Sequence, residues 1–176
     1  HDGERAVGRA AEAFNTLFGI SSLATGGIEE IGETIRTPTL FQLSSHKDKA
    51  LTWGMIDRCR AAGFDALALT VDTIVGGNRE RDLWTGFTSP PRLTTSSLVS
   101  FATHPSWTLN YLLREPFELS NLKDHIPEGS NVSISVSDYF STMLDQTMDW
   151  DAAAEVRERW GKAFCLKGIM SVEDAR

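Results

Sequence analysis

Four apolar segments of the sequence each end in side chains that can donate or accept hydrogen bonds. In chain order these side chains are Ser21 and Ser22, Gln42 and Ser44, Thr70 and Asp72, and Lys167. Gln42 and Lys167 lie inside otherwise apolar runs, and a buried amide or ammonium group needs a polar partner. The whole set suits a planar heteroaromatic ligand with donors and acceptors on its rim. For any single residue, the simpler explanation is a polar group where a strand gives way to a loop.

The segments that carry these residues alternate with helical patterns. The strand-like runs are Leu17 to Ser21, Thr39 to Leu43, Ala66 to Val71 and Ala163 to Lys167. Apolar residues with helical spacing fill the stretches before and between them: Ala6 to Phe14, Ile28 to Ile35, Leu51 to Ala62 and Ala152 to Trp160. Asp48 is a candidate helix cap, and Gly63 a candidate helix end. This alternation predicts parallel strands, and their apolar character predicts a sheet that is buried on both faces.

Strands and helices in this order make about half of a (β/α)8 barrel, whose complete form needs about 250 residues. The fold class predicted is therefore α/β, a partial TIM barrel, with a smaller open sheet as the alternative geometry. A long insertion, about residues 73–149, follows the third strand of this chain. A structureless loop of that length is improbable in a compact domain. We expect a helix near His104 to Arg114, with Trp107, Tyr111 and Leu112 as contacts.

Composition narrows the class of protein. The chain has 176 residues, of which 41% are hydrophobic, so we treat residues 1–176 as a single globular domain. Its net charge of -7 argues against nucleic acid as a partner, and no apolar run is long enough for a transmembrane segment. Cys59 and Cys165 lie in apolar segments, which fits buried reduced thiols better than a disulfide, and no metal site is predicted.

Seven short motifs together resemble the FMN-dependent 2-hydroxy-acid dehydrogenases and oxidases, a family that includes glycolate oxidase, L-lactate dehydrogenase and mandelate dehydrogenase. They are HDGER at 1–5, ISSLAT at 20–25, FQL at 41–43, HKD at 46–48, LTVDT at 69–73, GNRERD at 77–82 and LKGI at 166–169. Their order makes the resemblance more specific than any single motif, and it is weakest from about Thr94 to Phe140. It places the chain at about the second to fifth strands of the family's barrel.

The resemblance implies a role for each candidate residue. Ser21, Gln42 and Thr70 would hydrogen-bond the edge of the flavin ring of FMN. Lys167 would stabilise the negative charge of the reduced flavin. Asp72 would pair with the histidine that takes a proton from the substrate, and Arg79 would neutralise charge on the substrate. Without the resemblance, the simpler interpretation of Asp72 is a helix or turn cap, and that of Arg79 is a solvated surface charge beside Glu80.

The sequence also departs from the family. None of the four histidines (His1, His46, His104 and His125) matches the family's catalytic base, and we expect them in exposed or loop positions. That base, the arginine that clamps the substrate and the FMN phosphate site would lie beyond Arg176. General base catalysis alone contributes about 10²–10⁴-fold. We therefore expect this chain by itself to be inactive and to bind FMN weakly or not at all.

Two further departures concern single positions. Ser44 stands where the family has a tyrosine whose hydroxyl reaches the substrate. The serine side chain is too short to make the same bond, so substrate binding by Ser44 is doubtful. Ile74 stands where the family often has proline. Proline fixes the backbone angle φ, so isoleucine leaves the backbone at this position less constrained.

Three hypotheses for function remain open. The first is FMN-dependent oxidation of a small 2-hydroxy acid, L-lactate-like or mandelate-like, to the 2-oxo acid by an oxidoreductase that is a homo-oligomer in its intact form. The second is a catalytically dead, truncated remnant that acts only as a binding module. The third is another barrel enzyme that acts on a phosphorylated substrate. The mandelate branch uses its long loop to contact membranes, but Thr94 to Phe140 shows no clear basic amphipathic face. We expect a cytoplasmic location, with peripheral association with the inner membrane as the alternative.

Overall fold

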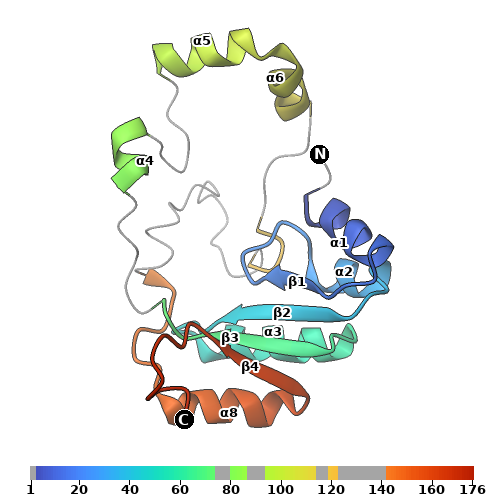
Figure 1. Ribbon diagram of the computed structural model, residues 1–176, viewed down its shortest axis with the longest axis vertical. Helices are drawn as coiled ribbons and strands as arrows, with labels where there is room; N and C mark the ends of the chain where they lie inside the picture. Colours follow the sequence, from blue (N-terminus) through green and yellow to red (C-terminus); the bar gives the residue numbers. More distant parts are fainter. Residues whose placement is uncertain (1–2, 74–79, 87–93, 114–118, 123–141) are drawn as a thin grey trace.

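A computed structural model of the protein describes residues 3–73, 80–86, 94–113, 119–122 and 142–176 (Figure 1). At its centre is a four-stranded parallel sheet in the order β1-β2-β3-β4. The strands are β1 (Phe18–Ser21), β2 (Thr39–Ser44), β3 (Ala66–Thr70) and β4 (Ala163–Lys167). All four predicted strands are confirmed, and the fold is the expected α/β arrangement of a partial barrel.

Helices α1 (Gly3–Ala13), α2 (Ile28–Thr34), α3 (Lys49–Ala61) and α8 (Trp150–Trp160) accompany the strands (Figure 1). The cap predicted for α3 is present, because an Asp48 carboxylate oxygen accepts a hydrogen bond from the backbone N–H of Ala50 at 2.9 Å. Gly63 follows the end of this helix with φ +82, a conformation that favours glycine. Asp149 caps α8 in the same manner, through Ala152 N–H at 2.9 Å. Local sequence therefore sets where these two helices begin.

The core lies on one face of the sheet, between the strands and the helices. Alternate residues of β1, β2 and β3 supply it: Phe18, Ile20, Phe41, Leu43, Leu67 and Leu69. The helices contribute Ile28, Ile31, Leu51, Met55, Cys59, Val156 and Trp160. In α8 the buried alanine is Ala153, one residue after the predicted Ala152. Each large apolar side chain buried here stabilises the fold by about 1.5–3 kcal/mol.

The opposite face of the sheet carries small and polar side chains. Here the expectation of a sheet buried on both faces is wrong for the edge strands, since Gly19 in β1 and Ala163, Cys165 and Lys167 in β4 are exposed. Cys59 is buried as predicted, and its burial raises the pKa of the thiol. The prediction that Cys165 is buried is wrong, because its apolar neighbours Phe164 and Leu166 point to the other face of the strand.

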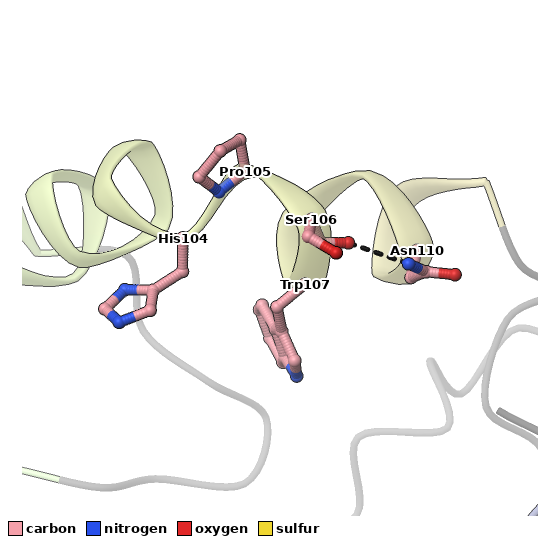
Figure 2. A pocket seen from close by; sticks show the side chains of 5 residues that line it. All are labelled: His104, Pro105, Ser106, Trp107 and Asn110. Carbon is pink, nitrogen blue, oxygen red and sulfur yellow. Dashed lines mark hydrogen bonds between the residues drawn. The ribbon is translucent and has the colours of Figure 1, made fainter.

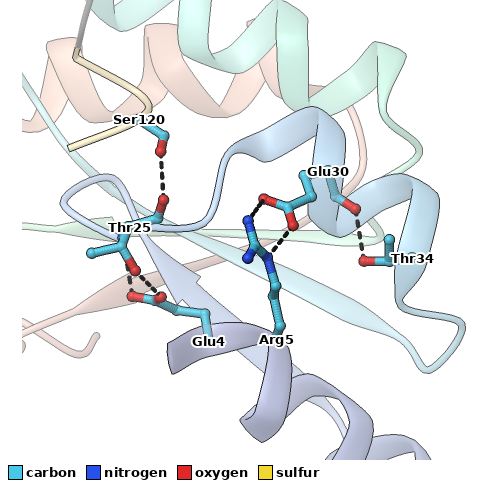
Figure 3. Close-up of polar contacts among 6 residues, drawn as sticks. All are labelled: Glu4, Arg5, Thr25, Glu30, Thr34 and Ser120. Atoms are coloured by element: carbon cyan, nitrogen blue, oxygen red, sulfur yellow. Dashed lines mark hydrogen bonds and ion pairs between the residues drawn. The ribbon is translucent and has the colours of Figure 1, made fainter. Parts of the chain in front are cut away.

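A network of polar contacts holds the loop that follows β1 (Figure 3). The Glu4 carboxylate of α1 accepts hydrogen bonds from the backbone N–H of Thr25 at 3.1 Å and from its hydroxyl. Partial burial raises the pKa of Glu4, but the hydrogen bonds from the Thr25 hydroxyl and from the backbone of Glu4, Thr25 and Gly26 together outweigh burial and hold this pKa below its usual value. Ser120 donates to the Thr25 carbonyl, and Arg5 pairs with Glu30 of α2. The loop is thus tied to both α1 and the insertion.

The insertion holds three further helices within its described residues: α4 (Glu80–Thr85), α5 (Thr95–Thr103) and α6 (Pro105–Leu112). The predicted helix near His104 to Arg114 is confirmed as α6, in which the rings of Trp107 and Tyr111 stack at 5.3 Å. No residue of α5 or α6 is buried, and both lie away from the sheet (Figure 1). Among the described helices, none is long and apolar enough to cross a membrane.

Two short parts of the insertion return to the core. Asn121 is buried and accepts a hydrogen bond from Ile28 N–H, the first residue of α2, at 3.0 Å. Leu144 is also buried, and it pairs with His46 across an antiparallel bridge. His46 lies in a loop as expected, but it is buried rather than exposed.

The approach of α2 to α3 yields a test with a matched control. A Cβ at Gly32 would lie 2.4 Å from the Ala62 carbonyl oxygen, whereas one at Gly54 in α3 would meet nothing within 4 Å. We expect Gly32→Ala to lower the free energy of unfolding by about 1–3 kcal/mol through overpacking. Gly54→Ala should raise it by up to about 1 kcal/mol, because alanine is the better helix former. Urea unfolding measures both. Equal stability of the two variants would contradict the close packing of α2 on α3.

Candidate active site

The predicted polar residues meet at the carboxyl edge of the sheet, on the face that carries small side chains. Strand register sets Ser44, Thr70 and Lys167 side by side on β2, β3 and β4. The next row toward the amino ends holds Ser21, Gln42, Ala68 and Cys165. In a barrel built of parallel strands, this is the edge where active sites form.

Gln42 is held by two hydroxyl groups of its neighbours. Its side-chain Nε2 donates to Thr70 Oγ1 and, at 3.4 Å, to Ser44 Oγ. Within the described residues nothing donates to Gln42 Oε1, so this oxygen is available as an acceptor. The Thr70 hydroxyl accepts from Gln42 and keeps its own hydrogen to donate. The pair can therefore offer one acceptor and one donor to a ligand.

Ser44 is only 4% exposed. Its hydroxyl is turned to Gln42, so the side chain supports the amide instead of projecting from the sheet. The period of two along a strand puts Gln42 and Ser44 on the same face of β2, but it does not show that the Ser44 hydroxyl turns toward the Gln42 amide.

Lys167 and Asp72 form an ion pair at the end of β4, with Nζ and Oδ1 3.5 Å apart. Both side chains are substantially exposed, at 52% and 40%, so the pair contributes little to stability. An ammonium group has three donors. Pairing with Asp72 therefore leaves two N–H groups of Lys167 for a ligand.

Ser21 is the last residue of β1 and pairs with Gln42 of β2. Its hydroxyl accepts a hydrogen bond from Leu23 N–H at 3.2 Å, and Ser22 N–H donates to the Gln42 carbonyl at 2.9 Å. The Ser22 hydroxyl is fully buried and has no hydrogen-bond partner among the described residues. The bend after β1 therefore fixes Ser21 next to Gln42.

The remaining candidates lie elsewhere. Arg79 falls outside the described residues, as do His1 and His125. His104 is exposed at the junction of α5 and α6, where its ring contacts the Ser100 carbonyl at 2.8 Å. It lines a shallow pocket with Pro105, Ser106, Trp107 and Asn110 (Figure 2). This pocket lies away from the carboxyl edge of the sheet, and none of its lining residues is Asp, Glu, Lys or Arg.

The described edge fits one rim of a flavin ring. Gln42 and Thr70 supply neutral acceptor and donor groups, and Lys167 supplies a positive charge. Cys165 and Gly168 also lie at this edge of the sheet, although neither was predicted as a site residue. The period of two along β4 could have identified Cys165, since it shares a face with Lys167.

Comparison with known proteins agrees with this geometry. The family model for FMN-dependent dehydrogenase matches residues 1–176. An L-lactate dehydrogenase of Vibrio cholerae is 33% identical over 99% of this chain and 46% of its own length. An L-lactate dehydrogenase of Pseudomonas aeruginosa is 31% identical over 99% of this chain and 45% of its own length. The chain thus spans less than half the length of these relatives.

Solved structures give the same result. The crystal structure of the monotopic membrane protein (S)-mandelate dehydrogenase matches with a TM-score of 0.86 and 28% identity, over 98% of this chain and 45% of that protein. A mandelate oxidase matches with a TM-score of 0.71 and 26% identity, over 99% of this chain and 40% of its own. Sequence motifs, strand register and both comparisons agree: the chain belongs to the FMN-dependent dehydrogenase family.

Proposed function

We propose that the carboxyl edge of this sheet binds FMN in an enzyme that oxidises a small 2-hydroxy acid to the 2-oxo acid. The observation that carries the proposal is the row Ser44, Thr70 and Lys167, with Gln42 held between two hydroxyl groups. The names of the relatives supply the substrate class, since lactate and mandelate are both 2-hydroxy acids. When bound, FMN accepts a hydride equivalent from the substrate.

Each residue has a distinct task under this proposal. Ser21, Gln42 and Thr70 hold the polar edge of the flavin ring through hydrogen bonds. Lys167 brings positive charge to that edge, and charge placed in advance is often the largest catalytic contribution. Asp72 orients the group that removes the substrate proton. Arg79 neutralises the carboxylate of the substrate.

Ser44 bears on the choice among 2-hydroxy acids. Its hydroxyl bonds Gln42, so it supports flavin binding and leaves the substrate side of the edge without a bulky group at this position. Leu23, which is partly buried in the loop after β1, is the other side chain that would form this wall. A pocket with small walls accepts both a methyl and a phenyl substituent on the hydroxy acid.

A flavin titration of the purified chain tests the site. FMN and riboflavin should bind weakly and with similar affinity, because the named residues all contact the ring and not the phosphate. Lys167→Met should weaken binding about tenfold or more, the usual size of a lost charge-assisted hydrogen bond. Lys49→Met is the matched control, since Lys49 is 60% exposed on α3 and its ion pair with Glu155 lies at the surface. Equal affinity of the two variants would contradict the proposed role of Lys167.

Anaerobic addition of L-lactate or (S)-mandelate to the flavin-loaded chain tests the reaction. Bleaching of the flavin absorbance would show that the residues of this chain suffice for oxidation of the substrate. Bound flavin that neither acid bleaches would show that the chain by itself binds flavin without oxidising either acid, which is the outcome expected for this chain alone.

We further propose that α5 and α6 contact a membrane surface. Residues 94–113 include no Asp, Glu, Lys or Arg, and seven of their large apolar side chains are exposed. These side chains are Leu98, Val99, Trp107, Leu109, Tyr111, Leu112 and Leu113. Exposed apolar patches mark interaction surfaces, and Trp and Tyr favour the membrane interface. The similar (S)-mandelate dehydrogenase structure is described as monotopic, which supports a lipid surface as the partner.

Sedimentation with phosphatidylcholine vesicles tests this surface. Leu112→Asp should lower vesicle binding about tenfold, because one buried apolar side chain contributes about 1.5–3 kcal/mol. Binding should change little with salt, since the helices carry no formal charge. Val7→Asp is the control, because Val7 is similarly exposed on α1, at 60% against 69% for Leu112. An equal loss in both variants, or no sedimentation of the original chain, would contradict the proposal.

A further inference from the structure

Gly168 follows Lys167 directly and lies against the side chain of Asp72. Its φ of +111 belongs to a conformation that side chains with a Cβ rarely adopt. A Cβ built at this position would lie 2.5 Å from Asp72 Cγ, 2.6 Å from Cβ and 2.9 Å from Oδ2. Contacts this short do not occur in folded proteins, so any other residue at 168 would have to displace Asp72.

Rotation of the Asp72 side chain cannot remove this conflict. Rotation about the Cα–Cβ bond moves Cγ and Oδ2 but leaves Cβ where it is, still 2.6 Å from the added atom. The ends of β3 and β4 would therefore have to separate. They are held together there by the hydrogen bond from Val71 N–H to the Lys167 carbonyl, at 2.9 Å.

Few other contacts fix the Asp72 carboxylate. The side chain is 40% exposed, and its one ion pair among the described residues is with Lys167 at 3.5 Å. An exposed pair of this kind is weak and does not hold two side chains in one geometry. The position of the carboxylate thus depends on the space that the missing side chain of Gly168 leaves open.

We propose that Gly168 is a positioning residue, whose lack of a side chain allows the Asp72 carboxylate to lie beside the Lys167 ammonium at the carboxyl edge of the sheet. The importance of that placement rests on the proposed function, in which Asp72 orients the group that removes the substrate proton and Lys167 brings positive charge to the flavin edge. The placement itself is a property of β3 and β4 and needs no flavin. It can therefore be tested even where flavin binding fails.

Zero-length cross-linking measures the placement directly. A carbodiimide joins a carboxylate to an amine only when the two are in contact, and mass spectrometry of the digested protein quantifies the Asp72–Lys167 link. Gly168→Ala should lower its yield about fivefold, because a shift of about 1 Å removes most of the proximity advantage. Gly161→Ala is the control: Gly161 also has a positive φ, +69, but a Cβ there would meet only the Glu158 carbonyl oxygen at 3.8 Å. Its link yield should stay unchanged.

Rescue experiments separate contact with Asp72 from backbone strain. Gly168→Ala should lower the urea unfolding midpoint most in the original chain and less in an Asp72→Ala background, which keeps Cβ. The loss should be smallest in an Asp72→Gly background, which removes every Asp72 atom in the conflict. An equal loss in all three backgrounds, or an unchanged link yield in Gly168→Ala, would overturn the proposal. Either result would leave the flavin titration of the Lys167 variant unaffected as a test of the proposed function.

Discussion

The parallel register of β2, β3 and β4 is the constraint on which the candidate site depends. It sets Ser44 beside Thr70 and Thr70 beside Lys167, although these residues come from segments far apart in the sequence. A shift of one residue in either pairing would turn one partner of each contact to the opposite face of the sheet. Because the other face is filled by buried apolar side chains such as Phe41, Leu43 and Leu69, such a shift would expose part of the core. Hydrophobic packing on one face thus fixes polar geometry on the other.

Ion pairs between neighbouring helices help to fix how α2, α3 and α8 pack beside the sheet. Arg58 of α3 pairs with Glu29 of α2 at 2.6 Å, and Arg159 of α8 pairs with Asp57 of α3 at 2.6 Å. The guanidinium of Arg58 holds the pKa of Glu29 below its usual value, while partial burial acts in the opposite direction. These pairs are exposed and individually weak. Their contribution is to the relative placement of helices whose apolar faces already carry most of the stability.

The sequence predicts the repetitive part of this fold well and its long-range contacts poorly. Apolar runs bounded by polar residues identify β1 to β4, and the cap at Asp48 identifies the start of α3, because those signals are local. Helices α4 and α5 went unpredicted: α4 has only six residues, and the sequence of α5, TSSLVSFAT, is rich in serine and threonine, which are weaker helix formers than alanine or leucine. The sequence also did not predict the exposure of Cys165, because an edge strand such as β4 and a central strand can have the same apolar character.

The same distinction applies within the site. Residue types alone suggested Gln42, Thr70 and Lys167, whereas the turn of Ser44 toward Gln42 and the contact of Gly168 with Asp72 appear only in three dimensions. The Gly168 contact involves two strand ends from opposite sides of the insertion. Neither residue is unusual in its local sequence, and the constraint lies in the distance between them. A glycine in a functional motif can therefore act through the space that it leaves for a charged neighbour, in addition to the backbone conformation that it permits.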